Sequence, residues 1–85
     1  MSVSTQLTVT TTPQLVGRVT EGSSSIWVHA GGTMYFGGDN TVSTTTGFRL
    51  DKDDKFGTII PEGNEVWVVG GAGATSTLYV FTTII

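Results

Sequence analysis

The feature that most constrains the fold is the alternation of apolar and polar or aromatic residues in short runs bounded by glycine. The run "SSIWVHA" alternates Ile26 and Val28 with Trp27 and His29, and "TMYFG" and "STLYVFT" show the same period. A period of two residues is typical of strands, because successive strand side chains point to opposite faces. No segment shows the helical period, so the sequence predicts an all-β protein.

Composition agrees with this prediction. The 85 residues include sixteen threonines, which favour strands, and twelve glycines, which favour turns. Seven or eight short strands are expected, from the segments 6–12, 15–20, 24–30, 33–37, 47–50, 55–60, 65–70 and 76–82, of which 47–50 is the one that could be absent. We predict one small antiparallel β-sandwich, jelly roll or barrel of about seven to eight strands. Residues 1–12 are its N-terminal arm or first strand, and residues 13–85 are the body of a single domain.

Two turns are predicted between these strands. Gly31 and Gly32 separate two alternating runs, and glycine tolerates a positive φ, so we expect a tight β-hairpin there. Pro61 to Asn64, "PEGN", has turn chemistry. Pro13 should end the first strand, because proline has no N–H to donate to a ladder.

Catalytic, metal-binding and nucleotide-binding functions find little support. His29 lies in mid-strand, which favours a structural or interface role over acid–base chemistry. Asp51, Asp53 and Glu62 match three positions of a calcium loop, but Phe56 stands where that loop needs glycine. "GGAGAT" and "FGGDN" lack the remaining residues of a phosphate-binding motif. We therefore expect no enzyme activity, no cofactor and no metal ion.

Net charge and hydropathy limit the classes of partner that we expect this chain to bind. With a net charge of −3 and four basic residues, the chain lacks the positive surface that nucleic acids require. No run reaches the roughly 18 apolar residues of a membrane span, and the first residues do not resemble a signal peptide. We expect synthesis in the cytoplasm and neither nucleic acid nor membrane as a partner.

Four aromatic residues lie on the strand faces opposite the aliphatic ones: Trp27, Tyr35, Trp67 and Tyr79. They form one predicted row of rings on a sheet surface, with three interpretations. The row belongs to the core, which we rank first, to a subunit interface, or to a sugar-binding surface. The C-terminal Ile84 and Ile85 would be exposed in a monomer, which favours burial against another subunit. The candidate interface residues are therefore Leu7, Val9, Trp27, Tyr35, Trp67, Tyr79, Ile84 and Ile85.

The order of these features resembles small all-β virion proteins of tailed bacteriophages. The resemblance runs from about Leu7 to Thr83: a Thr-rich strand, "MYFGG", a Ser/Thr run before "GFRL", an acidic turn, and "EVWVV" followed by a Gly/Ala loop. The segment "RLDKDDKFG" is more charged than is usual in that group, and similar proteins occur in tails and connectors.

The resemblance implies a structural role as a capsid decoration, or cement, protein on the outer surface of a phage head. The partners would then be the major capsid protein and further copies of this chain, as trimers or, less favoured, dimers. A tail or connector component and a small carbohydrate-binding module are the alternatives. We also expect the arm, Ser2 to Thr12, to add as a strand to a neighbouring chain.

Overall fold

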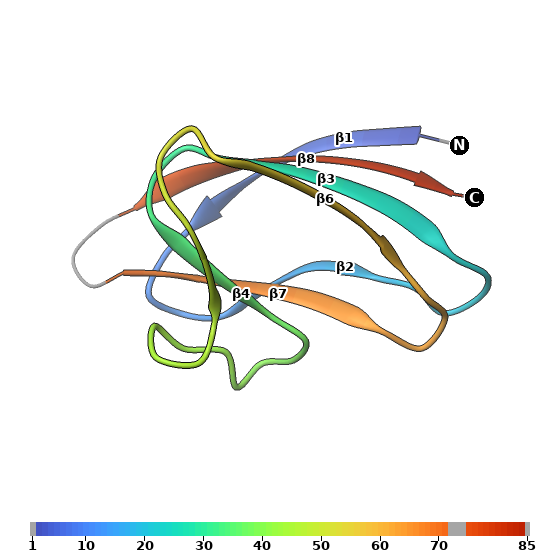
Figure 1. Ribbon diagram of the computed structural model, residues 1–85, viewed down its shortest axis with the longest axis horizontal. Coiled ribbons are helices and arrows are strands. Elements are labelled where there is room, and N and C mark those ends of the chain that lie inside the picture. The colour runs from blue at the N-terminus through green and yellow to red at the C-terminus, as the bar shows by residue number, and fades with distance from the viewer. Residues whose placement is uncertain (1, 72–74, 85) are drawn as a thin grey trace.

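The protein is a sandwich of two four-stranded antiparallel sheets (Figure 1). This computed structural model describes residues 2–71 and 75–84. Sheet A has the strand order β1-β8-β3-β6, and sheet B has the order β2-β7-β4-β5. The strands are β1 (Ser2–Val9), β2 (Gln14–Arg18), β3 (Ser24–Ala30), β4 (Met34–Gly37), β5 (Phe48–Leu50), β6 (Lys55–Ile60), β7 (Glu65–Gly70) and β8 (Ser76–Ile84).

The pairing identifies the sandwich as a jelly roll. Strand β1 pairs with β8, β2 with β7, β3 with β6, and β4 with β5, as in one long antiparallel ribbon folded at its middle. The further pairs β3–β8 and β4–β7 arise where this ribbon rolls up into two sheets. The predicted all-β sandwich class is confirmed, and the arrangement is the jelly roll.

The core lies between the sheets and follows the predicted alternation. In β8, Leu78 and Val80 are buried, whereas Tyr79 and Phe81 are 45% and 44% exposed. The largest fully buried side chains are Met34, Leu78, Val9 and Val68, which come from both sheets. The apolar positions of each strand therefore meet in one shared core.

The predicted hairpin at Gly31 and Gly32 is wrong. Strand β3 belongs to sheet A and pairs with β6 and β8, whereas β4 belongs to sheet B. The two glycines carry the chain from one sheet to the other, close against β8. A Cβ on Gly31 would lie 2.5 Å from the Thr77 carbonyl oxygen, and one on Gly32 would lie 2.2 Å from Ser76 Oγ. Close approach, and not a positive φ, explains these glycines.

The predicted turn at Pro61 to Asn64 is confirmed. The Asn64 N–H donates to the Pro61 carbonyl at 3.2 Å, and Gly63 has a φ of 83°. Strand β1 begins and ends earlier than the predicted residues 6–12, so Pro13 lies in the connection between β1 and β2 and does not itself end the first strand. The "GGAGAT" loop lies partly outside the described residues, because residues 72–74 are not described.

The N-terminal segment lies within its own sheet. Residues Ser2 to Val9 pair along their whole length with β8, from Ser2 opposite Thr83 to Val9 opposite Ser76. The two ends of the chain consequently lie at the same end of sheet A (Figure 1). One edge of β1 is occupied by β8, so only its other edge is free to pair with a strand of a neighbouring chain, and the expected strand addition stays a prediction.

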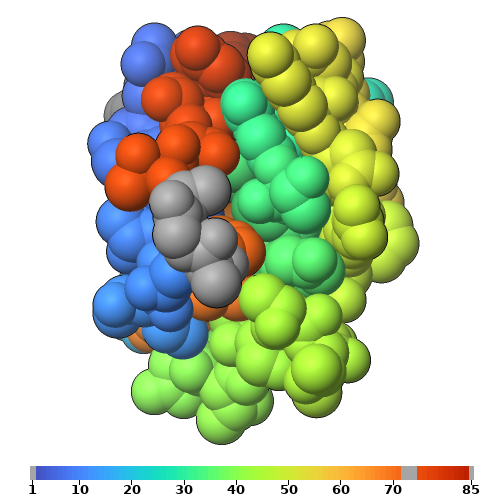
Figure 2. All heavy atoms as spheres, turned by 90° about the vertical axis from the view of Figure 1, so that its left-hand side faces the viewer, coloured from blue at the N-terminus to red at the C-terminus, as the bar shows by residue number. Residues whose placement is uncertain are grey.

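The loop between β4 and β5 covers part of the outer face of sheet B. Val42 from this loop is buried, and it lines a hollow together with Ser43, Val69 and Gly70. The Ser43 hydroxyl accepts hydrogen bonds from the backbone N–H groups of Thr45 and Thr46, which holds the Thr-rich turn in shape. Figure 2 shows this light green segment along the bottom of one end of the molecule. Sheet A has no comparable cover from the described residues.

Candidate binding face

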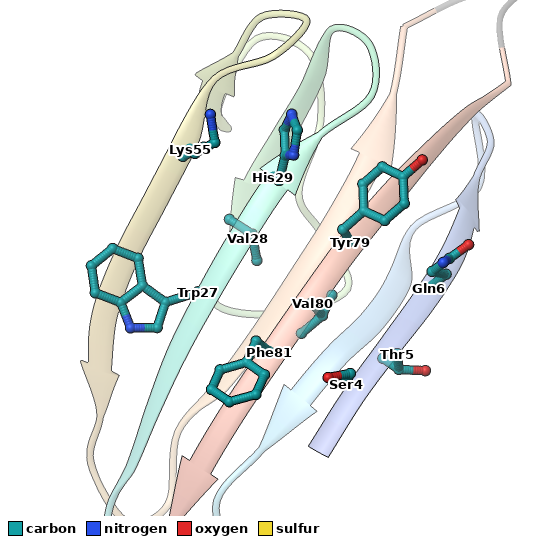
Figure 3. A pocket seen from close by; sticks show the side chains of 10 residues that line it. All are labelled: Ser4, Thr5, Gln6, Trp27, Val28, His29, Lys55, Tyr79, Val80 and Phe81. Carbon is teal, nitrogen blue, oxygen red and sulfur yellow. The ribbon is translucent and has the colours of Figure 1, made fainter. Parts of the chain in front are cut away.

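The outer face of sheet A, turned away from sheet B, carries a shallow groove of about 550 Å³. Trp27 and His29 project into it from β3, and Tyr79 and Phe81 from β8 (Figure 3). Ser4, Gln6 and Lys55 provide polar side chains from the two edge strands. We call this surface the ring face.

Strand register explains why the rings gather. Trp27 is directly opposite Phe81, and His29 is directly opposite Tyr79 on the next outward-facing row. Directly opposite residues on one face have Cβ atoms about 4.5–5.5 Å apart, which brings the four side chains together on one surface. The His29 and Tyr79 ring centroids lie 5.5 Å apart with an interplanar angle of 40°.

Trp27 is held flat against the sheet by Gly57. The two residues are cross-strand partners in the β3–β6 pair. A Cβ on Gly57 would lie 2.5 to 2.6 Å from three atoms of the six-membered indole ring, Cε3, Cδ2 and Cζ3. The ring therefore lies directly over the glycine backbone, an arrangement that also shields the glycine from water. With 57% of Trp27 exposed, its other side faces solvent in a fixed orientation.

His29 sits at the polar end of the ring face. Its Nε2 atom is itself shielded from solvent and lies 3.5 Å from Asp53 Oδ1, with no hydrogen bond to any described residue. Asp53 is in the left-handed region, with a φ of 69°, in the turn before β6. Lys55, opposite His29 in the β3–β6 register, adds a positive charge to this end. This end of the ring face therefore places the polar groups of His29 and Lys55 beside the exposed aromatic rings.

The outer face of sheet B has a different character. Tyr35 and Trp67 lie there, half-buried near the β4–β5 loop. The Trp67 Nε1–H donates to Glu65 Oε1 at 2.9 Å, and Arg18 donates to the other carboxylate oxygen. These two hydrogen bonds, that of Trp67 first, hold the pKa of Glu65 below its ordinary value. The polar atoms of this face are thus largely paired within the chain.

The predicted single row of four aromatic residues is wrong. Trp27 and Tyr79 lie on sheet A, whereas Tyr35 and Trp67 lie on the opposite surface of the sandwich. The cause is the roll, which places β3 and β4, and likewise β7 and β8, in different sheets. None of the four belongs to the buried core, so the preference for a core role is also wrong.

The remaining candidate interface residues separate into inner and outer positions. Val9 is completely buried in the core, and Leu7 packs against the core. Ile84 is 63% exposed at the end of β8, as expected for a single copy, while Ile85 lies outside the described residues. Among the described members of this group, only Ile84 presents a large apolar surface to solvent.

The acidic turn has its carboxylates engaged locally. Asp51 accepts a hydrogen bond from Arg49 at 2.8 Å, and the Asp54 carboxylate accepts the Asp51 backbone N–H at 2.8 Å. Glu62 lies in the turn beyond the other end of β6 and accepts the Gly22 N–H. Within residues 2–71 and 75–84, no three His, Asp or Glu side chains gather in a manner that would hold a metal ion.

Two features of the ring face were not predicted from the sequence. The sequence does not show that Phe81 lies opposite Trp27, because the β3–β8 pairing joins segments that are far apart in the chain. Gly57 was overlooked because a lone glycine in a strand does not reveal what lies above it. A glycine in an otherwise regular strand run is nevertheless a signal of close approach by another group.

Comparisons with known proteins support the fold. No protein-family model and no curated protein matches the chain. A solved structure of a protein from Bacillus endospore appendages, described as a family of disulfide-linked pili, is similar, with a TM-score of 0.65. The match covers 96% of this chain and 81% of the appendage chain at 14% sequence identity. At that identity the likeness shows a shared fold. Among the described residues, no helix is long and apolar enough to cross a membrane.

Proposed function

We propose that this chain is a non-enzymatic structural protein that works as one of many copies in a larger assembly, which it contacts through the ring face. The observation that carries the proposal is the exposure of Trp27, Tyr79 and Phe81 side by side on an uncovered sheet. Tryptophan and tyrosine are enriched where interfaces derive most of their affinity. A rigid, flat ring also loses little conformational entropy when a partner covers it.

The fold supports this kind of role by analogy. The similar appendage protein builds pili that are disulfide-linked. This chain contains no cysteine, so copies of it would have to associate by packing and hydrogen bonds alone. Many weak contacts suffice in a repetitive assembly, because each bound copy raises the effective concentration of the next contact.

For the place of action we propose the outer surface of a phage head, where the chain would decorate and stabilise the capsid. This part of the proposal rests on the sequence resemblance, including "MYFGG" and "EVWVV". The partners would be the major capsid protein and further copies of the chain. A tail or connector position uses the same contacts and differs only in which particle component binds.

The experiment is co-sedimentation of purified protein with undecorated phage heads and with isolated tails. Trp27→Ala should weaken binding about 30-fold, the effect of losing an aromatic hot spot worth about 2 kcal/mol. Phe48→Ala is the matched control, because Phe48 is 56% exposed, as Trp27 is 57% exposed, but lies in sheet B. Equal binding by both variants would remove the ring face from the proposal. A wild-type protein that sediments with neither heads nor tails would refute the location.

A second function is favoured by one specific observation. The rings of the groove stand beside the polar side chains of Ser4, Gln6 and His29, as in surfaces that stack on sugar rings and hydrogen-bond their hydroxyls. A neutral oligosaccharide is therefore the alternative ligand of the same face. Tryptophan fluorescence titrated with a panel of soluble oligosaccharides distinguishes the two functions. A saturable change that is abolished in Phe81→Ala, a variant that keeps both tryptophans, would favour the sugar.

A further inference from the structure

The four edge strands of the sandwich differ in how well they are protected against pairing with another chain. Exposed edges are usually blunted by shortness, bulges, charges or proline. Strand β5 has three residues, and β2 has a bulge between Leu15 and Gly17 followed by Arg18. Strand β6 begins with Lys55 and is followed at once by Pro61.

Strand β1 has none of these protections. It is eight residues long, its sequence "SVSTQLTV" has no charge and no proline, and it pairs with β8 without a register shift. Most of its residues are exposed. A long, regular and uncharged edge is a ready template for another strand.

The direction of the backbone groups in β1 follows from two hydrogen bonds. The Thr77 carbonyl accepts the Gly31 N–H at 2.8 Å, so the backbone groups of Thr77 point toward β3. Its partner in β1, Thr8, therefore forms a pair that is not hydrogen-bonded, and the backbone groups of Thr8 point away from β8. The Thr8 carbonyl indeed accepts the Gln14 side-chain amide at 2.8 Å.

Because backbone directions alternate along a strand, the N–H and C=O groups of Ser2, Ser4 and Gln6 also point to the free edge. Those of Val3, Thr5 and Leu7 point to β8. Gln14 occupies the edge at Thr8. The open part of the edge thus runs from Ser2 to Gln6 and is centred on Ser4.

We propose that this open edge pairs with the same edge of a second copy, antiparallel and across a two-fold axis at Ser4. In this register Ser4 faces Ser4 of the second copy, and Ser2 faces its Gln6. The three pairs use every open backbone group, giving about six hydrogen bonds. The absence of charge in β1 means that no like charges are brought together.

The pairing would join the two sheets A into one continuous sheet of eight strands. Ser4 and Gln6 also line the groove of the ring face, so the two grooves would meet across the axis. Val3, which is 50% exposed, would lie beside Thr5 of the second copy. The inference rests on the proposed self-assembly and supplies its contact between copies. Since this contact is small, we expect weak association, seen at high protein concentration.

Amide hydrogen exchange, followed residue by residue in parallel with sedimentation velocity, tests the register. At a total concentration about ten times the dissociation constant, roughly a fifth of the protomers are free, so the Ser4 and Gln6 amides should exchange about fivefold more slowly than in dilute solution. The Thr5 and Leu7 amides, already bonded to β8, should not change with concentration. If the protein forms an oligomer but the Ser4 and Gln6 amides still exchange at the rate seen in dilute solution, the edge contact is refuted and the proposed self-assembly is not. A monomer at every concentration would refute both.

Three variants provide a second test. Gln6→Pro removes one N–H from the free edge but none from the β8 ladder, so it should remain folded and become monomeric. Gln6→Ala, which removes the same side chain and keeps the N–H, should still dimerise. Thr5→Pro removes a ladder N–H and should melt well below the other two. A dimeric Gln6→Pro, or a wild-type species larger than a dimer with fast Ser4 exchange, would overturn the proposal.

Discussion

Gly31→Ala should destabilise the protein by about 2 kcal/mol, because the added methyl group meets backbone that has nowhere to move. The Cβ would lie 2.5 Å from the Thr77 carbonyl oxygen and 3.4 Å from the Thr77 carbonyl carbon and amide nitrogen. Relieving such overpacking costs about 1–3 kcal/mol. The movement also weakens the 2.8 Å hydrogen bond from Gly31 to Thr77, worth about 0.5–1.5 kcal/mol. Alanine also lowers the conformational entropy of the unfolded chain relative to glycine, which offsets about 0.4–1 kcal/mol of this destabilisation.

The assay is urea unfolding, with thermal melting as a check. A loss of about 2 kcal/mol is a large part of the roughly 4–13 kcal/mol expected for a domain of this size, and it lowers Tm by about 8–16 °C. Gly38→Ala is the matched control, since a Cβ there meets nothing within 4 Å and φ is not positive. It should stabilise the protein by about 0.4–1 kcal/mol. If the two variants unfold at the same urea concentration, the close contact between residue 31 and β8 is not real.

Three further perturbations test the ring face, the sheet B face and the core. Gly57→Ala should displace the Trp27 indole, shift tryptophan emission and weaken binding to the assembly, whereas unchanged emission would contradict the stacked geometry. Glu65→Gln should flatten the pH dependence of stability in urea titrations between about pH 6 and 3. The folded pKa of Glu65 is lowered, so its contribution is present above its unfolded pKa and is lost as pH falls through the folded value. An unaltered pH profile would show that this carboxylate contributes nothing. Met34→Ala, at a fully buried site, should cost about 2–5 kcal/mol, and Val3→Ala, at a half-exposed site, less than about 1 kcal/mol. Similar costs for both would contradict the assigned core.

The local pattern was enough to predict the strands, apart from the bounds of the first one, and the strand face on which each side chain lies. In β8, a two-residue period separated buried Leu78 and Val80 from exposed Tyr79 and Phe81, because a pleated strand turns alternate side chains to opposite faces. Glycine, proline and asparagine likewise marked the turn at residues 61–64 by their backbone preferences. These properties depend on neighbours along the chain, so the sequence by itself determined them.

Only the tertiary structure decided which strands pair with one another. The Gly31-Gly32 signal suits a hairpin as well as a crossing between sheets, because both need a residue without a side chain. In the jelly-roll topology β4 lies in sheet B, and β8, which is far along the chain, lies beside β3. This topology thereby divided four aromatic residues between two outer surfaces and placed Phe81 beside Trp27. Alternation assigns a side chain to a face of its strand, but long-range pairing decides which residues share that face.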